Sequence, residues 1–175
     1  LSQRFQEVLK DLKIFNAGSH IKSPMGLSIT QTLLATEFAD QKELIDSRMG
    51  LSNKLETHPR LLLYSLLCAR GVNDPVILRA AHKYKATGET KYQKEQHRSA
   101  LVVFIQNEIK SNLDITVDIG TTETSALVQC DHTFDAFLCC IAGLTFLNNK
   151  NISPQQQDID PETLKKEGFI SVIDF

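Results

Sequence analysis

The sequence predicts an α/β domain, because segments with the period of helices alternate with short segments that have the period of strands. Two helix starts are indicated by Pro59 and Pro75, since proline is favoured in the first turn of a helix. Polar and apolar residues alternate over 54–58 and again over 169–174, as in short strands. At 175 residues the chain can bury a sizeable core, and we expect a single domain over residues 1–175.

The first third of the chain is expected to be mainly helical. Phe5, Val8, Leu9 and Leu12 share one face of a helix that Ser2 is suited to cap. The expected elements are an amphipathic helix over residues 1–15, a loop or a short edge strand over 16–26, one or two helices over 28–47 and a strand over 54–58. Pro59 then ends this strand and begins a helix that runs to Gly71.

The remaining elements are indicated by caps and by periodicity. Asp74 is suited to cap a helix that begins at Pro75, and a longer helix is expected over 89–112. Apolar residues alternate over 115–119, so that the segment 113–128 is either a short strand with a loop or an irregular connection. An apolar helix after residue 130, a short helix from Pro161 to Gly168 and a terminal strand over 169–174 complete the prediction.

The overall charge gives no strong indication of a partner. The formal net charge is −2 and the pI is about 6.2, so binding to nucleic acid would need a local basic surface or bridging metal ions. The polar first half of the helix over 89–112 offers Lys91, Lys94 and Arg98 as candidate nucleic-acid-binding residues. The alternative for these three residues is an ordinary solvated helix face.

The cysteines and the hydropathy pattern favour a cytoplasmic protein with no membrane segment. Cys68, Cys130, Cys139 and Cys140 lack the spacing of zinc sites or of a disulfide framework, so reduced thiols are expected. Cys139 and Cys140 lie in the apolar helix and are expected to be buried. No uncharged apolar stretch of eighteen residues occurs.

Two aspartates stand four residues apart at the start of the apolar helix, which places them on the same face. Asp131 and Asp135 would then point in one direction, and Glu56 is expected near the end of the strand over 54–58. Carboxylates that converge from different elements are the ligands of Mg²⁺ or Mn²⁺ in sites that cleave phosphodiesters. The alternatives are a capping role for Asp131, a water-facing Glu56, and an Asp135 that is solvated or paired with a cation.

Four segments of the sequence, taken in order, resemble a known family. They are "KLETHPR", "HRSALVVF", "CDHTFDAFLCCIAGLTF" and "EGFISVIDF", and together they resemble the carboxyl-terminal two thirds of a family of predicted nucleases in the ribonuclease H-like superfamily. The resemblance implies a ribonuclease H-like mixed sheet flanked by helices. It also implies catalytic and metal-binding roles for Glu56 and Asp135, with Asp131 as a secondary match.

The sequence departs from this family at its amino-terminal end. The family's first strand, which carries an Ile-Asp-Gly type segment, has no counterpart here, so the fold is expected to lack its N-terminal strands in this chain. Two functions follow as hypotheses. One is a nuclease that uses Mg²⁺ or Mn²⁺ at Glu56, Asp131 and Asp135; the other is a catalytically silent module that binds a protein or a nucleic acid.

Overall fold

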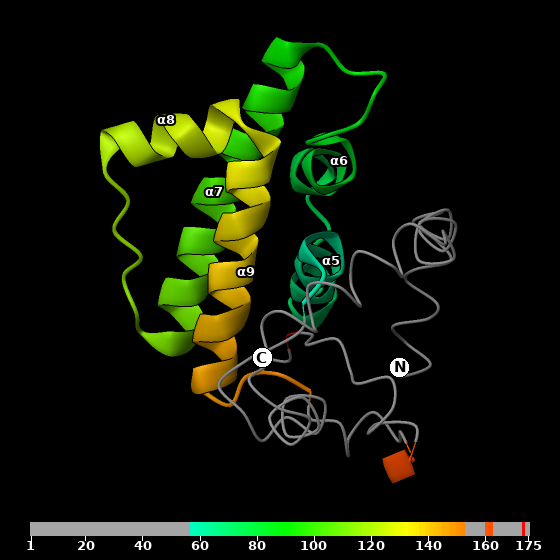
Figure 1. The fold of residues 1–175 in the computed structure, drawn as a ribbon, viewed down its shortest axis with the longest axis vertical. Coiled ribbons are helices and arrows are strands. Elements are labelled where there is room, and N and C mark those ends of the chain that lie inside the picture. The colour runs from blue at the N-terminus through cyan, green and yellow to red at the C-terminus, as the bar shows by residue number, and fades with distance from the viewer. Residues whose placement is uncertain (1–56, 153–159, 163–172, 174–175) are drawn as a thin grey trace. The chain divides into compact units, whose positions relative to one another are not determined.

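The computed structural model describes residues 57–152, 160–162 and 173 of the chain (Figure 1). The helices discussed below belong to one compact unit, which comprises residues 57–151 and 171–175. They are α5 (Pro59–Ala69), α6 (Pro75–Lys83), α7 (Lys91–Leu113), α8 (Thr121–Gln129) and α9 (Asp131–Leu147).

Side chains just before three of the helices satisfy backbone N–H groups that the first turn leaves without a partner. His58 Nδ1 accepts from the backbone N–H of Leu61 at 3.2 Å, and Asp74 caps α6 in the same manner. Thr90 and Gln93 form a reciprocal capping box at the start of α7. The predicted helices at Pro59, at Pro75 and over 89–112 are therefore confirmed.

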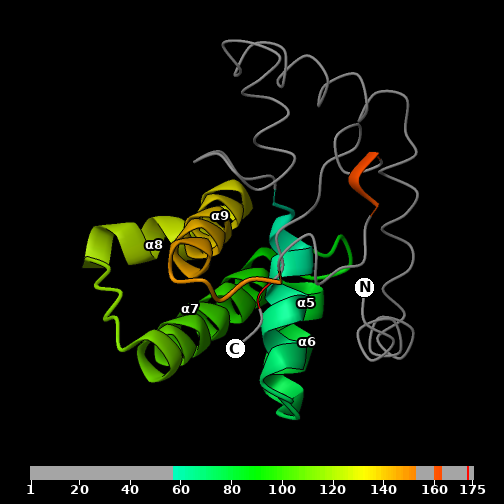
Figure 2. The same ribbon diagram turned by 90° about the horizontal axis from the view of Figure 1, so that it is seen from below.

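The packing of the helices forms a ring. Helix α5 packs against α6 and α9, α7 packs against α6 and α8, and α8 packs against α9 (Figures 1 and 2). Each helix therefore turns one apolar side toward the interior, where burial removes it from water. The largest fully buried side chains are Tyr84, Phe134, Leu62, Leu63, Leu66, Leu101, Ile105, Ile109, Leu138 and Thr145.

The prediction of an α/β fold with a ribonuclease H-like mixed sheet is wrong. Within the described residues the regular structure is helical, and β pairing is limited to one isolated antiparallel bridge between Asn151 and Ile173. The predicted strands at the two ends of this unit lie outside the described residues, apart from residues 57, 58 and 173. Residues 57 and 58 are not in a strand.

The alternation at Ile115, Val117 and Ile119 has a different cause from the one that suggested a strand. These residues are half-buried and their neighbours are exposed, in an extended connection between α7 and α8. The connection is held to α7 by Gln106, whose Nε2 donates to the carbonyl of Val117 at 2.8 Å. An extended segment that lies on a helix shows the period of a strand without any strand partner. An irregular connection, the second alternative, is thus confirmed for residues 114–120 only, because residues 121–128 belong to helix α8.

Helix α8 has no clear signal in the sequence. Its residues TTETSALVQ are rich in β-branched threonine, which lowers helix propensity, so the segment was not predicted to be helical. Contacts with α7 and α9 override that weak preference. The helices expected within residues 1–47, and the short helix over 161–168 except for Pro161 and Glu162, lie outside the described residues.

Helix α9 corrects the prediction for two of the cysteines. Cys139 and Cys140 are exposed, although most of the residues around them in the helix are apolar. The side of α9 that faces the core carries Phe134, Leu138, Ile141, Ala142 and Thr145, at helical spacing. The two cysteines fall between these positions and therefore point away from the core.

Among the described residues, no single helix has the length and apolar character needed to cross a membrane. Helices α8 and α9 taken together are long and apolar enough, by length and composition alone, but the chain bends by 114° between them.

Candidate functional site

The carboxylate of Asp135 is paired with two donors from the end of α6. Tyr84 Oη donates to Asp135 Oδ1 at 2.9 Å, and Lys85 Nζ donates to Asp135 Oδ2 at 2.6 Å. The sequence left three alternatives for this acid, namely solvation, pairing and metal binding. The structure shows pairing, with a short charge-assisted hydrogen bond to a lysine.

The ring of Tyr84 is the buried centre of this cluster. It packs against Phe134 with ring centroids 5.1 Å apart, and both Arg60 and Lys85 lie over it, at 5.6 Å and 5.3 Å from its centroid. Burial, followed by the charge of Asp135, raises the pKa of Tyr84 well above its ordinary value of 10.0. The phenol therefore remains a hydrogen-bond donor over the whole physiological range.

His58 lies at the edge of the same cluster and is held in its neutral form. Burial, then the positive charges of Lys85 and Arg60, lower the pKa of His58 from its ordinary value of 6.5. The hydrogen bond that Nδ1 accepts from Leu61 also needs an unprotonated nitrogen. His58 is thus a helix cap whose protonation would break the cap.

This arrangement predicts a loss of stability in mild acid. In the unfolded chain His58 takes up a proton near pH 6.5, whereas in the folded protein it resists protonation. The unfolded state therefore binds more protons below pH 6.5, so the free energy of unfolding falls as the pH drops through that range. Urea titrations between about pH 8 and pH 5 measure this slope.

The variant His58→Asn isolates the contribution of the cap. Asparagine is a good N-cap that does not titrate, so we expect near wild-type stability at pH 8 and a shallower loss toward pH 5. His132→Asn, at an exposed position of α9, is the control and should keep the wild-type slope. A slope unchanged by His58→Asn would show that other groups cause the acid sensitivity, His82 being the first to test.

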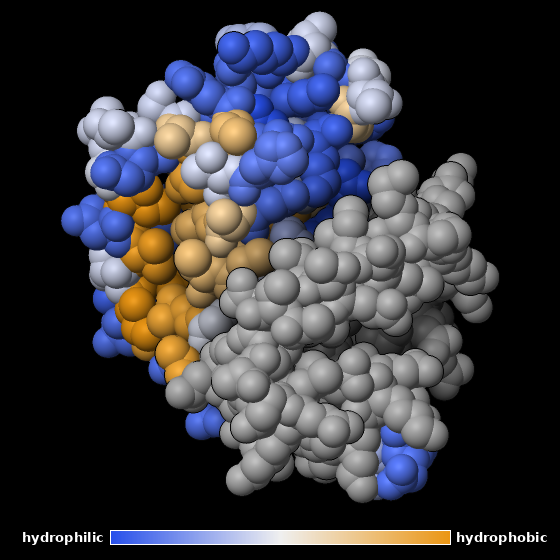
Figure 3. Space-filling view, viewed as in Figure 1, coloured by the Kyte–Doolittle hydropathy of each residue, from blue (hydrophilic) through white to orange (hydrophobic). Residues whose placement is uncertain are grey.

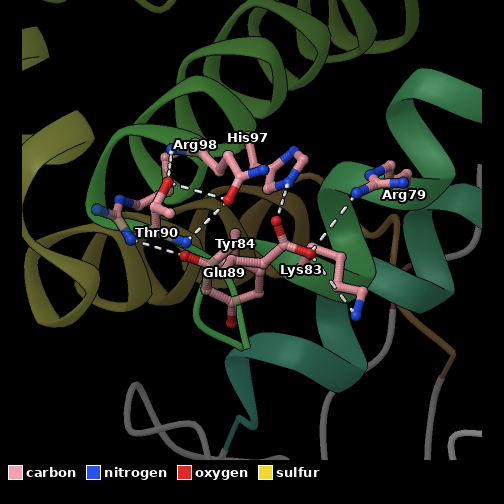
Figure 4. Close-up of polar contacts among 8 residues, drawn as sticks. Arg79, Lys83, Tyr84, Glu89, Thr90, His97 and Arg98 are labelled. Carbon is pink, nitrogen blue, oxygen red and sulfur yellow. Dashed lines mark hydrogen bonds and ion pairs between the residues drawn. The ribbon is translucent and has the colours of Figure 1, made fainter. Parts of the chain in front are cut away.

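A second cluster surrounds Glu89, in the turn between α6 and α7 (Figure 4). Glu89 Oε1 lies 3.7 Å from both Arg79 Nη2 and Lys83 Nζ, and Oε2 lies 3.7 Å from His97 Nε2. The Glu89 side chain is 8% exposed, whereas that of Arg79 is 63% exposed. One nearly buried carboxylate thus faces two cations of α6 and the imidazole of His97 from α7.

Arg98 is a structural cation in the interior of the unit. Its side chain is 3% exposed, and its guanidinium donates to the carbonyls of Tyr84 at 2.7 Å, Val128 at 2.6 Å and Gln129 at 3.4 Å. The Tyr84 bond is visible in Figure 4. These contacts occupy the fork of the guanidinium, so Arg98 does not offer it at the surface.

The other two predicted nucleic-acid-binding residues lie on the first turns of α7. Lys91 is 83% exposed and stands 3.8 Å from Glu95 Oε1, and Lys94 is partly exposed. In Figure 3 the hydrophilic colour covers the region of α6 and of the start of α7. The structure adds Arg79 and Lys83 of α6 to this region, which sequence reasoning missed.

Of the three predicted metal ligands, the structure describes only Asp131 and Asp135. Glu56 lies outside the described residues, Asp131 accepts a hydrogen bond from the backbone N–H of His132 at 3.2 Å, and Asp135 is paired with Lys85. In the described part of the chain, no group of three or more His, Cys, Asp or Glu residues is placed to hold a metal ion. A metal at Asp135 would have to displace the lysine or share the carboxylate with it.

Comparisons of the chain with protein-family models, with curated proteins and with solved structures found no match. The resemblance to predicted nucleases stays a prediction, and the geometry of the described residues is the basis for a function.

Proposed function

We propose that the helical unit is a binding module for nucleic acid, which contacts the phosphate backbone through Arg79, Lys83, Lys91 and Lys94. The observation that carries this proposal is a local reversal of charge. The four proposed cations of residues 79–98 outnumber the two glutamates of this segment, Glu89 and Glu95, so the surface carries a net +2 in a chain of net charge −2. A basic surface of this kind is what an acidic chain needs in order to attract a polyanion.

The geometry of these side chains supports contact with an extended backbone. Arg79 and Lys83 are four residues apart, on one face of α6, and the start of α7 follows after a short turn. The ionic contacts of Arg79, Lys83 and Lys91 with glutamates are 3.7–3.8 Å long, beyond hydrogen-bond distance. Their N–H donors therefore remain suited to phosphate oxygens.

Tyr92 favours a single-stranded ligand. Its side chain is among the exposed large apolar groups, at 67%, and it stands directly beside Lys91. Aromatic rings next to cationic side chains stack with unpaired bases, which a duplex does not present. We therefore expect single strands to bind more tightly than duplexes of the same length.

Fluorescence anisotropy with a labelled single-stranded 20-mer tests the proposal. Affinity should fall steeply between about 50 and 200 mM salt, because phosphate contacts release counterions. The double variant Arg79→Gln/Lys91→Gln should weaken binding about tenfold at low salt and give a shallower salt slope. Binding that is independent of salt, or absent, would reject the phosphate-binding surface.

Lys110→Gln provides the matched control for this experiment. Lys110 is an exposed lysine in the last turn of α7 and is bonded to Asp114 Oδ1 at 2.7 Å. Its replacement removes one positive charge at a position outside the proposed surface. The dissociation constant should therefore change by less than about twofold. If Lys110→Gln lowered the affinity as much as Arg79→Gln alone, the nucleic acid would be attracted by the overall charge of the protein and not by a defined site.

A further inference from the structure

Glu89 occupies the inner side of the basic surface. Its carboxylate stands at the same distance, 3.7 Å, from the nearest nitrogen of Arg79, Lys83 and His97. Figure 4 shows the three side chains converging on it from α6 and α7. The contacts with Arg79 and Lys83 are ionic rather than hydrogen-bonded, so they neutralise these two cations without fixing the direction of their donors.

The outer side of the same cations is open to solvent. Glu89 is 8% exposed, while the side chains of Arg79 and Lys83 are 63% and 35% exposed. A phosphate that arrives from solvent therefore meets cations whose charge the buried Glu89 carboxylate already partly neutralises. We infer that Glu89 is an internal counter-ion that limits the affinity of this surface for phosphate, an inference that rests on the proposed function.

The turn that carries Glu89 is held in place independently of its carboxylate. The backbone N–H of Glu89 donates to the carbonyl of Ala86 at 3.2 Å, and Thr90, the next residue, forms the capping box of α7. Glu89→Gln keeps the size of the side chain and leaves both of these backbone contacts in place. The variant therefore removes the charge and preserves the geometry of the surface.

The expected gain follows from Coulomb's law. A carboxylate about 7 Å from a bound phosphate, at a protein surface, repels it enough to change the dissociation constant roughly three- to tenfold. Glu89→Gln should therefore tighten binding to the single-stranded 20-mer by that factor at about 50 mM salt. Glu89→Met, a second neutral variant of similar size, should give the same gain and keeps the test valid if Glu89→Gln folds poorly.

Glu123→Gln is the matched control. Glu123 is an exposed acid in the first turn of α8, and its replacement changes the net charge by the same single unit. Its effect should stay below about twofold, because an exposed charge away from the surface is screened by salt. Equal gains from Glu89→Gln and Glu123→Gln would overturn the inference, as would no gain from Glu89→Gln and Glu89→Met.

A double-mutant cycle shows whether Glu89 acts through its cationic neighbours. In a chain that already carries Arg79→Gln and Lys83→Gln, the gain from Glu89→Gln should shrink to less than half. An undiminished gain would overturn the role as counter-ion. Salt-dependent binding by the wild type with no gain in the neutral variants rejects this inference alone, whereas no binding by any variant rejects the proposed function as well.

Discussion

Replacement of Arg98 by glutamine is expected to lower the free energy of unfolding by about 3 kcal/mol, the largest effect that we predict for a single side chain. Arg98 is 3% exposed, and its guanidinium donates to three backbone carbonyls, those of Tyr84, Val128 and Gln129. Glutamine is too short to reach all three. Buried acceptors would be left without donors, and each such loss costs about 1–3 kcal/mol.

The position of these carbonyls explains how a buried cation is tolerated without a carboxylate. Val128 and Gln129 end α8, and Tyr84 is the C-cap of α6, so their oxygens lie at the negative ends of two helices. Arg98, from α7, joins both ends. The arginine therefore supplies side-chain donors to carbonyls at the C-terminal ends of α6 and α8.

Denaturant titrations of the full chain measure this effect. Arg98→Lys keeps the charge but not the planar fork, and should recover only a part of the lost stability. Lys94→Gln, one turn earlier on α7, is the control and should change the free energy of unfolding by less than about 0.5 kcal/mol. An Arg98→Gln protein as stable as the wild type would disprove the structural role of the three hydrogen bonds.

Replacement of Asp135 by asparagine is expected to lower the free energy of unfolding by about 2 kcal/mol. The change removes the ion pair with Lys85 and leaves one amide oxygen for two donors, Tyr84 and Lys85. The value lies below that of a fully buried pair because both partners retain some exposure, 29% for the Lys85 side chain and 22% for that of Asp135. Asp131→Asn, one turn earlier, should cost only a few tenths of a kcal/mol.

A double-mutant cycle with Lys85→Met isolates the pair. If Asp135 acts mainly through Lys85, the two substitutions together should destabilise the protein by clearly less than the sum of their separate effects. Strictly additive effects would place the contribution of Asp135 elsewhere, for example in its bond to Tyr84.

The same proteins test the nuclease hypothesis through Mg²⁺ and Mn²⁺. A metal that binds only the folded state raises the unfolding temperature by mass action. Because the Lys85 ammonium already neutralises Asp135, we expect no metal-dependent shift in the wild type or in Asp135→Asn. A shift in the wild type that Asp135→Asn abolishes, together with cleavage of a single-stranded or duplex substrate, would instead support metal-dependent catalysis at this residue.

The sequence by itself determined the features that depend on neighbours within one helical turn. Pro59 and Pro75 correctly placed two helix starts, and Asp74 was correctly predicted to cap α6. The sequence also singled out Asp135 as an acid that is solvated, paired or metal-bound, since it follows Phe134 in an apolar helix. Periodicity misled at Ile115–Ile119, because half-burial of an extended segment gives the same alternation as a strand.

Only the tertiary structure decided which side chains meet. Lys85 and Asp135 are 50 residues apart, and Arg98 and Val128 are 30 apart, so no local spacing predicts either contact. Arg98 looks like any basic residue on the polar half of a helix, yet it is buried because α7 carries it to the ends of α6 and α8. The sequence neighbourhood set the starts of α5 and α6, whereas α8 and the burial and pairing of charges depend on which helix ends and side chains the packing brings together.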